Sequence, residues 1–326
     1  MIAAWLCLGM FSGAILAQSP LETRQVELSP TVKNGDRIGR MRFLGMLELP
    51  GIKHDGVRLS QLSGLAWDDD EGILYAVSDK GALFHLKPEF NGNTLAGLKI
   101  LRAVTLRELG GRNNLKPSRS DAEDMDILNG RNGRKGDAEL VISFERFPRI
   151  ARYHPDGRAI AEHDIPPPLN DGKNYRNPNK MLESVCVDPD RGIITAPEDP
   201  LKNAPEGYTG LYSLSGNHWR YPLAAAHRIT ALACLGRGEV IVLQQQYMLA
   251  IGQIGITLSR VHLPATSVAN PLRPETIVTL DSRDGYLIDN FEGLAHHRRG
   301  RFFMVSDNND LFVQRTLLMY FELLDD

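Results

Sequence analysis

The sequence predicts an all-β protein built as a single β-propeller, and three observations lead to this fold class. One pattern recurs along the chain, its hydrophobic runs have the length of strands, and its turns are those of hairpins. Each unit consists of a polar residue, a small residue, an apolar run, a polar turn and a second apolar run with a polar end. Units of this kind cover 62–81, 122–146, 182–199, 229–247 and 290–309.

The apolar runs predict strands joined as hairpins. They are four to six residues long, rich in β-branched or aromatic side chains, and bounded by Asp-Gly, Arg-Gly or Asn-Gly turns. The first polar positions of the units are 60, 60, 47 and 62 residues apart, whereas a common propeller repeat has about 40–45 residues. The extra length lies in Pro-, Gly- and Asn-rich loops such as 108–120 and 164–180.

The two ends of the chain each supply a strand without a unit of its own, at 40–49 and 316–324. We expect these strands to pair and form a closing blade, because closure leaves no free sheet edge. The expected number of blades is then six, with five and seven as the alternatives. No linker-like stretch divides the chain, so the predicted organisation is a signal peptide at 1–19, an N-terminal extension at 20–39 and one propeller domain at 40–326.

The first nineteen residues, MIAAWLCLGMFSGAILAQS, are apolar and rich in small side chains. The run is short and interrupted by Gly and Ser, which favours a secretory signal cleaved near Ala17 or Ser19 over a membrane span. No Lys or Arg precedes it. We therefore expect an exported protein, periplasmic or secreted, without stable membrane insertion after cleavage.

Charge, cysteine usage and missing motifs exclude several classes of function. The net charge is −3, so nothing points to nucleic acid as a partner. Cys186 and Cys234 lie in apolar runs and are expected to be buried thiols, with a single disulfide as the alternative. His296 and His297 are expected to be solvated on a basic turn. The chain contains no nucleophile elbow, Walker A or H-E-x-x-H motif, which disfavours a serine hydrolase, a kinase or a zinc protease.

A polar residue begins the first strand of every unit, and another ends the second strand. In an antiparallel hairpin these two positions meet at one end of the blade. Because the first strand of a propeller blade lines the central channel, the polar positions of all units should converge at one channel mouth. The pairs are Ser63/Asp79, Glu123/Glu145, Glu183/Glu198, Thr230/Gln245 and Glu292/Asp307.

Seven carboxylates brought together repel one another unless water, cationic side chains or a metal ion compensates their charge. Oxygen ligands without His or Cys favour a hard divalent cation, calcium before magnesium. The expected ligands are Glu123, Glu183 and Glu292. Lys80, Arg146 and Lys180 could instead pair with the acids or bind an anionic substrate. The simpler alternative is that acids at strand ends only stabilise turns.

The order and spacing of LSGLAW…YAVSDKG, DAEDMDIL…VISFER, NPNKMLESV, ITALACL…VIVL and NFEGLA…FFMVSDNN resemble the bacterial phytase-like family, also described as having esterase-like activity of phytase. The resemblance runs from about residue 40 to the end and implies an exported propeller that hydrolyses phosphoric esters. One unit departs from the family pattern of Leu-Glu-Arg, because Leu243 is followed by Gln244, Gln245 and Gln246. The matching positions are Ser63, Asp79, Glu123, Glu145, Arg146, Asn179, Lys180, Glu183, Glu292, Asp307 and Asn308.

Two functions from different classes follow. The first is an exported hydrolase of phosphoric or related esters that uses a divalent cation and a small anionic ester substrate. Its catalytic residues would be Asp79, Glu145 and Asp307, and its substrate-binding residues would be Lys80, Arg146, Lys180 and Asn308. The second is a non-catalytic binding propeller with a structural cation site, which the missing Glu-Arg pair favours. The sequence leaves the oligomeric state open.

Overall fold

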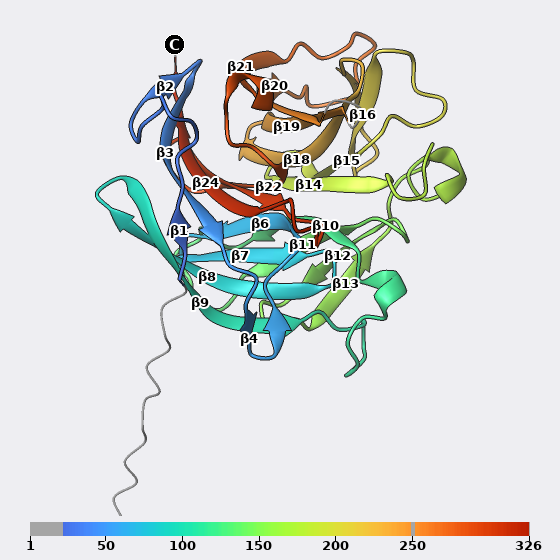
Figure 1. The fold of residues 1–326 in the computed structure, drawn as a ribbon. Coiled ribbons are helices and arrows are strands. Elements are labelled where there is room, and N and C mark those ends of the chain that lie inside the picture. The colour runs from blue at the N-terminus through green and yellow to red at the C-terminus, as the bar shows by residue number, and fades with distance from the viewer. Residues whose placement is uncertain (1–21, 249–251, 326) are drawn as a thin grey trace, which may run out of the picture.

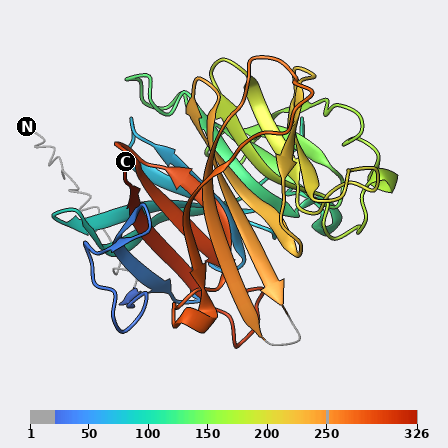
Figure 2. The same cartoon turned by 90° about the horizontal axis from the view of Figure 1, so that it is seen from above.

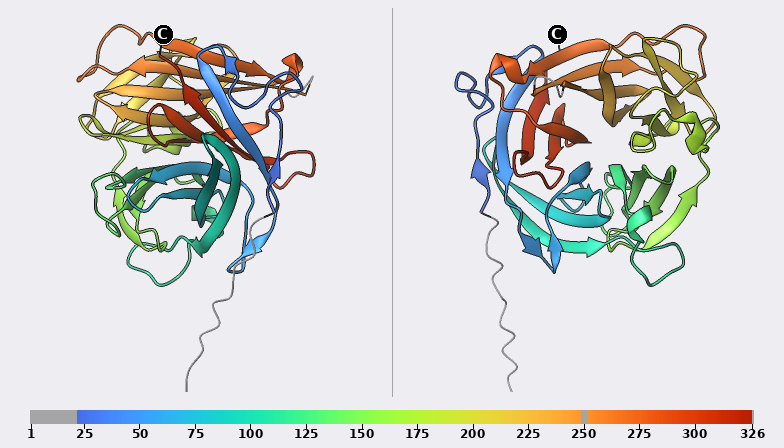
Figure 3. Two further views of the ribbon diagram at one scale, coloured as in Figure 1. Left: turned by 90° about the vertical axis from the view of Figure 1, so that its left-hand side faces the viewer. Right: turned by 45° about the vertical axis from the view of Figure 1, so that its right-hand side comes forward.

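The computed structural model describes residues 22–248 and 252–325, and the predicted signal peptide at 1–19 lies outside them. The described chain is a β-propeller, in which sheets of antiparallel strands stand side by side in a ring (Figure 3). In this part of the chain no helix is long and apolar enough to cross a membrane. The few helical turns are the 3-10 segments η1 (Pro117–Arg119), η2 (Gly172–Asn174) and η4 (Ser282–Asp284).

Four of the blades are consecutive in sequence and contain four strands each (Figure 1). Blade 1 comprises β6 (Leu62–Asp68), β7 (Ile73–Ser78), β8 (Ala82–Asn91) and β9 (Thr94–Thr105). Blade 2 comprises β10 (Ala122–Leu128), β11 (Glu139–Phe144), β12 (Arg149–Tyr153) and β13 (Ala159–His163). Blade 3 comprises β14 (Leu182–Asp188), β15 (Gly192–Pro197), β16 (Tyr208–Ser213) and β17 (His218–Pro222). Blade 4 comprises β18 (His227–Gly236), β19 (Glu239–Met248), β20 (Gln253–His262) and β21 (Glu275–Asp281).

The fifth blade joins the two ends of the chain. It consists of β22 (Asn290–His296), β23 (Arg301–Asp307), β24 (Thr316–Leu323) and the N-terminal strand β3 (Met41–Leu49). The predicted pairing of the terminal strands is present, from Thr316 opposite Leu49 to Leu323 opposite Met41. In Figure 1 the blue β3 and the red β24 therefore lie side by side.

The predicted count of six blades is wrong, since the structure has five. Each sequence unit is only the inner hairpin of a blade, and two further strands complete it. In the described residues the last unit, 290–309, is followed by one strand, β24, so β24 and β3 complete that blade instead of adding another. β1 (Arg24–Gln25) and β2 (Arg37–Ile38) also pair with β3, so part of the predicted extension at 20–39 widens this sheet. The short hairpin of β4 (Lys53–His54) and β5 (Val57–Arg58) lies between β3 and β6.

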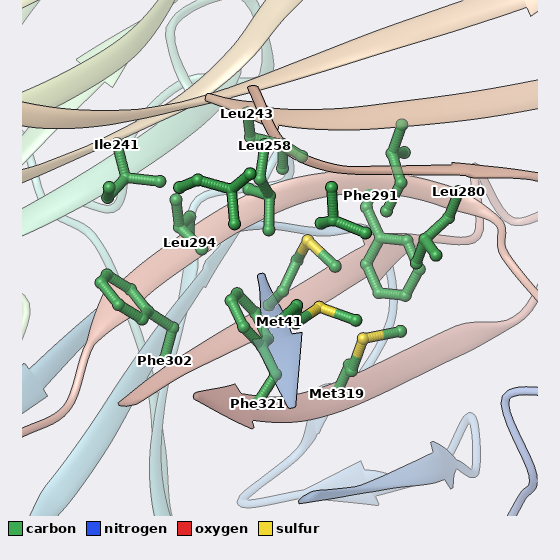
Figure 4. Packing of buried hydrophobic residues seen from close by; sticks show 14 of the residues in the cluster. Met41, Ile241, Leu243, Leu258, Leu280, Phe291, Leu294, Phe302, Met319 and Phe321 are labelled. Carbon is green, nitrogen blue, oxygen red and sulfur yellow. The ribbon is translucent and has the colours of Figure 1, made fainter. Parts of the chain in front are cut away.

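The hydrophobic core lies between the faces of neighbouring blades. Between blades 4 and 5 it contains Leu243 and Leu258 on one side and Met319 and Phe321 on the other, all at most 1% exposed (Figure 4). Figure 2 shows the orange strands of blade 4 next to the red strands of blade 5. Successive side chains of an inner strand point to opposite faces of its blade, and both faces are buried against neighbouring blades. The inner strands are therefore continuous apolar runs in the sequence.

The small residue of the repeat lets neighbouring inner strands approach closely. A Cβ atom on Gly64 would lie 2.6 Å from the backbone nitrogen of Met125 in blade 2. A Cβ atom on Gly293 would lie 2.7 Å from the backbone oxygen of Ser63 in blade 1. Both separations are too short for a side chain, so glycine at these positions is a packing requirement of the ring.

Cys186 and Cys234 form a disulfide, which corrects the expectation of two buried thiols. Cys186 lies on β14 and Cys234 on β18, the first strands of neighbouring blades. Neighbouring first strands pack against each other, and this brings the two Cα atoms to 5.4 Å. The bond therefore links two blades across a sequence separation of 48 residues.

The expectation of two solvated histidines is also corrected. β22 continues to His296, so the turn begins only after the histidines. His297 is 1% exposed, its Nδ1 lies 2.7 Å from the Tyr320 hydroxyl, and its ring packs edge-on against Trp67. Burial lowers the pKa of His297 to about 3 and that of His296 to about 4. Both imidazoles are neutral and belong to the packing of blades 1 and 5.

Candidate functional site

The first strands of the five blades, β6, β10, β14, β18 and β22, form the innermost ring, and each contacts the next. A cavity of about 460 Å³ lies at the mouth where these strands begin. Side chains from all five blades line it. We call this cavity the acidic mouth, because eight of the side chains that line it are carboxylates.

The first polar position of every unit lies in a β-bulge. In each blade the register between the first and second strands shifts at this residue: Ser63, Glu123, Glu183, Thr230 and Glu292. A bulge bends the strand locally and re-aims its side chain. Three of these positions, Glu123, Glu183 and Glu292, line the acidic mouth as predicted.

The other two bulge positions turn their hydroxyl groups to backbone oxygens. Ser63 donates to Gln61 at 3.4 Å, and Thr230 donates to Phe291 at 3.1 Å. Neither residue is part of the cavity lining. Blades 1 and 4 therefore contribute no carboxylate from their first strand.

The acids that end the second strands, Asp79, Glu145, Glu198 and Asp307, also line the acidic mouth. Because of the bulge, each of these positions does not lie opposite the first polar residue of its unit. It lies opposite the residue that comes two positions earlier in the sequence. Asp307 pairs with Asn290, Gln245 pairs with Arg228, and the amide of Glu145 donates to the Asp121 backbone oxygen at 3.0 Å.

This register explains which lining residues sequence reasoning missed. Asp121, Arg228 and Asn290 line the cavity two residues before the predicted positions Glu123, Thr230 and Glu292. Alternate residues of a strand point to the same side. The spacing of two was therefore the signal that could have identified them.

Three cationic side chains line the acidic mouth, and all are paired with acids. Arg146 Nε lies 2.8 Å from Asp121 Oδ2. Lys180 Nζ and Arg228 Nη1 both lie 2.7 Å from Glu198 Oε1. Arg146 and Lys180 were predicted from the sequence, whereas Arg228 was not.

The structure places the other two predicted substrate-binding residues outside the lining. Lys80 Nζ lies 3.4 Å from Asp79 Oδ2 at the edge of the cavity. Asn308 Oδ1 accepts a hydrogen bond from the backbone nitrogen of Gln61 at 3.1 Å, and its neighbour Asn309 lines the cavity instead. Lys80 therefore contacts the lining residue Asp79, and Asn308 joins the loop after β23 to the residue before β6.

Eight carboxylates line the mouth against the three cations. Burial, followed by repulsion from neighbouring acids, raises the pKa of Glu123, Glu183 and Glu292 well above the ordinary range. The eight are Asp79, Asp121, Glu123, Glu145, Glu183, Glu198, Glu292 and Asp307. Without a compensating cation, the site is therefore costly to ionise.

Burial also raises the pKa of three acids at the strand ends, Glu145, Asp307 and Asp79. Burial raises the pKa of Glu145 to about 7, although the Met181 amide donates to it at 3.0 Å and lowers the value. Burial likewise raises the pKa of Asp307 to about 7 and that of Asp79 to about 6. Groups with such values can exchange protons at physiological pH.

The carboxylates form two groups with the geometry of a cation site. Oxygens of Asp121, Glu123 and Glu145 lie within 4.8 Å of one another, and so do oxygens of Glu145, Glu183 and Glu198. Glu145 belongs to both groups. Asp79 Oδ1 is buried beside them and has no hydrogen-bond partner in the described part of the chain. A donor set of oxygens alone, with one buried acceptor left over, fits a hard divalent cation.

A family model described as "Phytase-like: Esterase-like activity of phytase" matches residues 57–310. The chain belongs to this family. The matched range includes every carboxylate of the acidic mouth. No curated protein matches the chain.

Three solved structures that are similar to this phytase-like protein have low sequence identity to it. The "Structure of Dos1 propeller" has a TM-score of 0.38 and 8% identity, over 89% of this chain and 79% of that one. The Cps50 (Swd1) β-propeller domain from Myceliophteria thermophila has 0.39 and 10%, over 92% and 98%. YCF48 from Cyanidioschyzon merolae has 0.38 and 10%, over 93% and 98%.

Blade 4 of this phytase-like protein replaces a carboxylate with an amide at Gln245. Gln245 Nε2 donates to Asn290 Oδ1 at 2.6 Å, and Asn290 Nδ2 donates to Glu292 Oε1. The hydrogen bond from Asn290 lowers the pKa of Glu292, against the larger effect of burial. The substitution therefore removes one charge and supplies a donor chain to a neighbouring acid.

Proposed function

We propose that this phytase-like protein is an exported hydrolase of phosphoric or related esters that acts with a divalent cation in the acidic mouth. The observation that carries the proposal is the pair of carboxylate groups that share Glu145. Glu123, Glu145 and Glu183 would hold the cation with Asp121 and Glu198, and Glu292 adds negative charge beside them. Calcium suits this oxygen-only set, with magnesium as the alternative.

The cation, when bound, supplies Lewis-acid polarisation of the ester oxygen. The chain supplies the proton acceptor. Asp79 Oδ1 is buried without a partner among the described residues, and the pKa of Asp79 is raised by burial to about 6. Asp79 is thus suited to accept a proton from the attacking water, and Asp307 of the neighbouring blade 5, whose pKa burial raises to about 7, can do the same.

The anionic part of the substrate would bind to the cationic side chains of blades 2 to 4. Lys180 and Arg228 share one oxygen of Glu198, so each can turn donors to a ligand while remaining anchored. Arg146 is more than half exposed and lies beside Asp121. Lys80 and Asn308 would act from outside the cavity, by steering the ligand and shaping the loop after β23.

Export is supported by the disulfide as well as by the apolar N-terminal segment. Disulfides persist in oxidising compartments such as the periplasm and the extracellular space. The Cys186–Cys234 bond would be stable there. The proposed location is therefore periplasmic or secreted.

The second candidate is a binding propeller in which the cation has only a structural role. The amide at Gln245 favours it, because this position carries a carboxylate in the other four blades. In this case the acidic mouth would bind a cation and a ligand without turnover.

The deciding experiment measures phosphate release from a panel of phosphoric esters, with calcium and with EDTA. We expect activity that needs the cation and falls at least 100-fold in Glu183→Gln. Glu89→Gln, a change in the exposed ion pair with Lys99 on blade 1, is the matched control. Undiminished activity in Glu183→Gln would refute this site. Calcium-induced stabilisation without hydrolysis of any ester would favour the binding propeller.

A further inference from the structure

The lining of the acidic mouth has two chemically different sides. The cationic side chains, Arg146, Lys180 and Arg228, belong to blade 2, to the connection into blade 3 and to the start of blade 4. The apolar ones, Tyr247 and Leu311, belong to the end of β19 in blade 4 and to the loop after β23 in blade 5. A ligand in the cavity therefore meets cationic side chains on blades 2 to 4 and, on blades 4 and 5, apolar side chains next to further acids.

The apolar side continues outwards over the rim. Next to Leu311, which is 54% exposed, Phe312 is fully exposed and Val313 is 82% exposed. Met248, next to Tyr247, is 40% exposed. Large apolar side chains on a surface are ordinary when single, but a contiguous group beside a cavity marks a binding surface.

Exposed apolar side chains concentrate on this face of the described structure. The face consists of the loops that join second to third strands and of the connections between blades. Phe147 lies in a loop of the first kind, and Ile52 and Leu109 lie in connections of the second kind. Among the other exposed large apolar residues of the described ranges, Leu101 lies within β9 and Val268 lies on the opposite face.

The loop at 308–315, which carries these apolar side chains, is held by hydrogen bonds and an ion pair. Within it, the Leu311 amide donates to the Asn308 oxygen at 2.7 Å, and Asn309 Nδ2 donates to Gln314 Oε1 at 3.1 Å. Asp310 forms an ion pair of 3.5 Å with Arg58 of the neighbouring connection. The exposure of Phe312 and Val313 is therefore imposed by an internally bonded loop.

The charges of the cavity restrict the other end of the ligand. Eight carboxylates face three cations, so a ligand with many negative charges would be repelled unless several cations accompanied it. A single phosphate group requires only the proposed cation and the side chains on the cationic side. The site therefore fits one anionic group better than a polyanion.

We propose that the ligand of the acidic mouth is an amphiphilic phosphoric ester, with one phosphate group in the cavity and an alkyl chain over Tyr247, Leu311 and Phe312. The inference rests on the proposed function for the identity of the phosphate group. The apolar rim on blades 4 and 5 supplies the evidence for the chain. The substrate class is thus a lipid-like phosphate ester.

The test measures calorimetric binding of methyl-, butyl-, hexyl- and octylphosphonate, which resemble phosphate esters but are not hydrolysed, in excess calcium and below their micelle concentrations. Complete burial of one methylene gives a factor of about four in affinity. Because the rim is partly open, we expect about twofold tighter binding for each methylene. In the double variant Leu311→Ser/Phe312→Ser, which keeps only Tyr247 of these three side chains, the dependence on chain length should become much weaker. Val268→Ser makes the same kind of change on the opposite face and should behave as wild type.

Affinity that does not change with chain length, no binding of any phosphonate, or an unchanged trend in the double variant would overturn the inference. Phosphate release from the matching alkyl phosphates separates it from the proposed function. Chain-dependent binding without release refutes the hydrolase alone, whereas release that is independent of chain length refutes the amphiphilic ligand alone. Sedimentation with phosphatidylcholine vesicles containing phosphatidic acid shows whether the ligand is a membrane lipid or a soluble ester. If the protein sediments with the vesicles, the ligand is a lipid in a bilayer. If it binds the dispersed phosphonates but not the vesicles, the ligand is a soluble ester.

Discussion

Gln245 Nε2 lies 2.6 Å from Asn290 Oδ1 and donates a hydrogen bond to it, which fixes the orientation of the Asn290 amide. The amide nitrogen of Asn290 then faces Glu292 Oε1 and donates to it. Because a carboxylate cannot donate when ionised, glutamate at position 245 could not hold Asn290 in this orientation. Gln245, the one amide among the strand-end acids, thus orients Asn290 so that Asn290 donates a hydrogen bond to Glu292.

The first prediction concerns Gln245→Glu. The variant loses the donor to Asn290 and adds a ninth carboxylate to the mouth, so it should unfold more easily at pH 8 in EDTA. One lost hydrogen bond with an unsatisfied partner costs about 1–3 kcal/mol. Excess calcium should recover most of the loss, as measured by denaturant unfolding. Gln246→Glu, next in sequence but outside the cavity lining, is the control. Equal stabilities of the two variants in EDTA would contradict the role of Gln245.

The sequence predicted the ring of acids because strand period and hairpin pairing are local properties. Glu123, Glu183 and Glu292 reach one mouth since each begins an inner strand at the same place in its unit. The blade count failed because only the inner hairpins share a pattern. The third and fourth strands vary, and those of the last blade come from opposite ends of the chain.

The disulfide was predicted only as the alternative, and the position of Arg228 was not predicted, because both depend on contacts between blades that no local sequence pattern specifies. The disulfide exists because Cys186 and Cys234 lie on first strands that pack against each other. Arg228 reaches the cavity because a bulge at Thr230 shifts the register, and an ion pair with Glu198 of blade 3 then anchors it. A register shift of one residue changes which side chains share a face, and an apolar pattern alone does not specify it.

The second prediction uses the position of Glu145 in both carboxylate groups. A cation bound at 100 times its dissociation constant stabilises the folded state by about 2.7 kcal/mol. Calcium should therefore stabilise wild type most, Glu123→Gln less, and Glu145→Gln least, since only the last variant disrupts both groups. Thermal unfolding in EDTA and in excess calcium measures the three differences. The same calcium response in both variants would show that Glu145 is not shared.

The third prediction is that stability in EDTA decreases as the pH rises from 5 to 8. Burial raises the folded-state pKa of Glu145 and Asp307 to about 7, above the ordinary values of 4.5 and 3.8. Between the unfolded and folded values the folded protein binds more protons than the unfolded chain. Its free energy of unfolding therefore falls by about 1.4 kcal/mol per pH unit for each extra proton.

Denaturant titrations at several pH values in EDTA measure this slope. Stability should be greatest near pH 4, decline as the pH rises through about 7, and continue to fall above it as Glu123, Glu183 and Glu292 ionise, because the pKa of each is raised well above its ordinary value. Glu183→Gln, which removes one of the repelling charges, should be more stable than wild type at pH 8 and less dependent on pH. A stability that rises with pH over this range would contradict the buried state of these acids.

The fourth prediction concerns the disulfide between Cys186 and Cys234, which closes a sequence separation of 48 residues. A loop of this length loses enough entropy in the unfolded chain for the bond to contribute about 4 kcal/mol. Cys186→Ala/Cys234→Ala should lower the free energy of unfolding by about 2–4 kcal/mol. Wild type in a reducing agent should approach the double variant, and the reducing agent should not affect the variant. A double variant as stable as oxidised wild type would show that the disulfide does not stabilise the folded protein.

The last prediction concerns Asp124, which lies on β10 directly after Glu123 and is fully buried. Its Oδ2 accepts from the amides of Val185 at 3.0 Å and Leu232 at 3.4 Å. One carboxylate thus joins the first strands of three blades, and burial raises its pKa while these donors lower it. Asp124→Asn keeps the volume of the side chain but places an NH₂ group opposite a backbone N–H donor, at a cost of about 1–3 kcal/mol for each donor left unsatisfied.

Asp126→Asn is the matched comparison, because Asp126 Oδ2 accepts a hydrogen bond from one other blade, at Val187. Denaturant unfolding should rank Asp124→Asn as the less stable variant, and the reverse order would show that Asp124 does not link the blades.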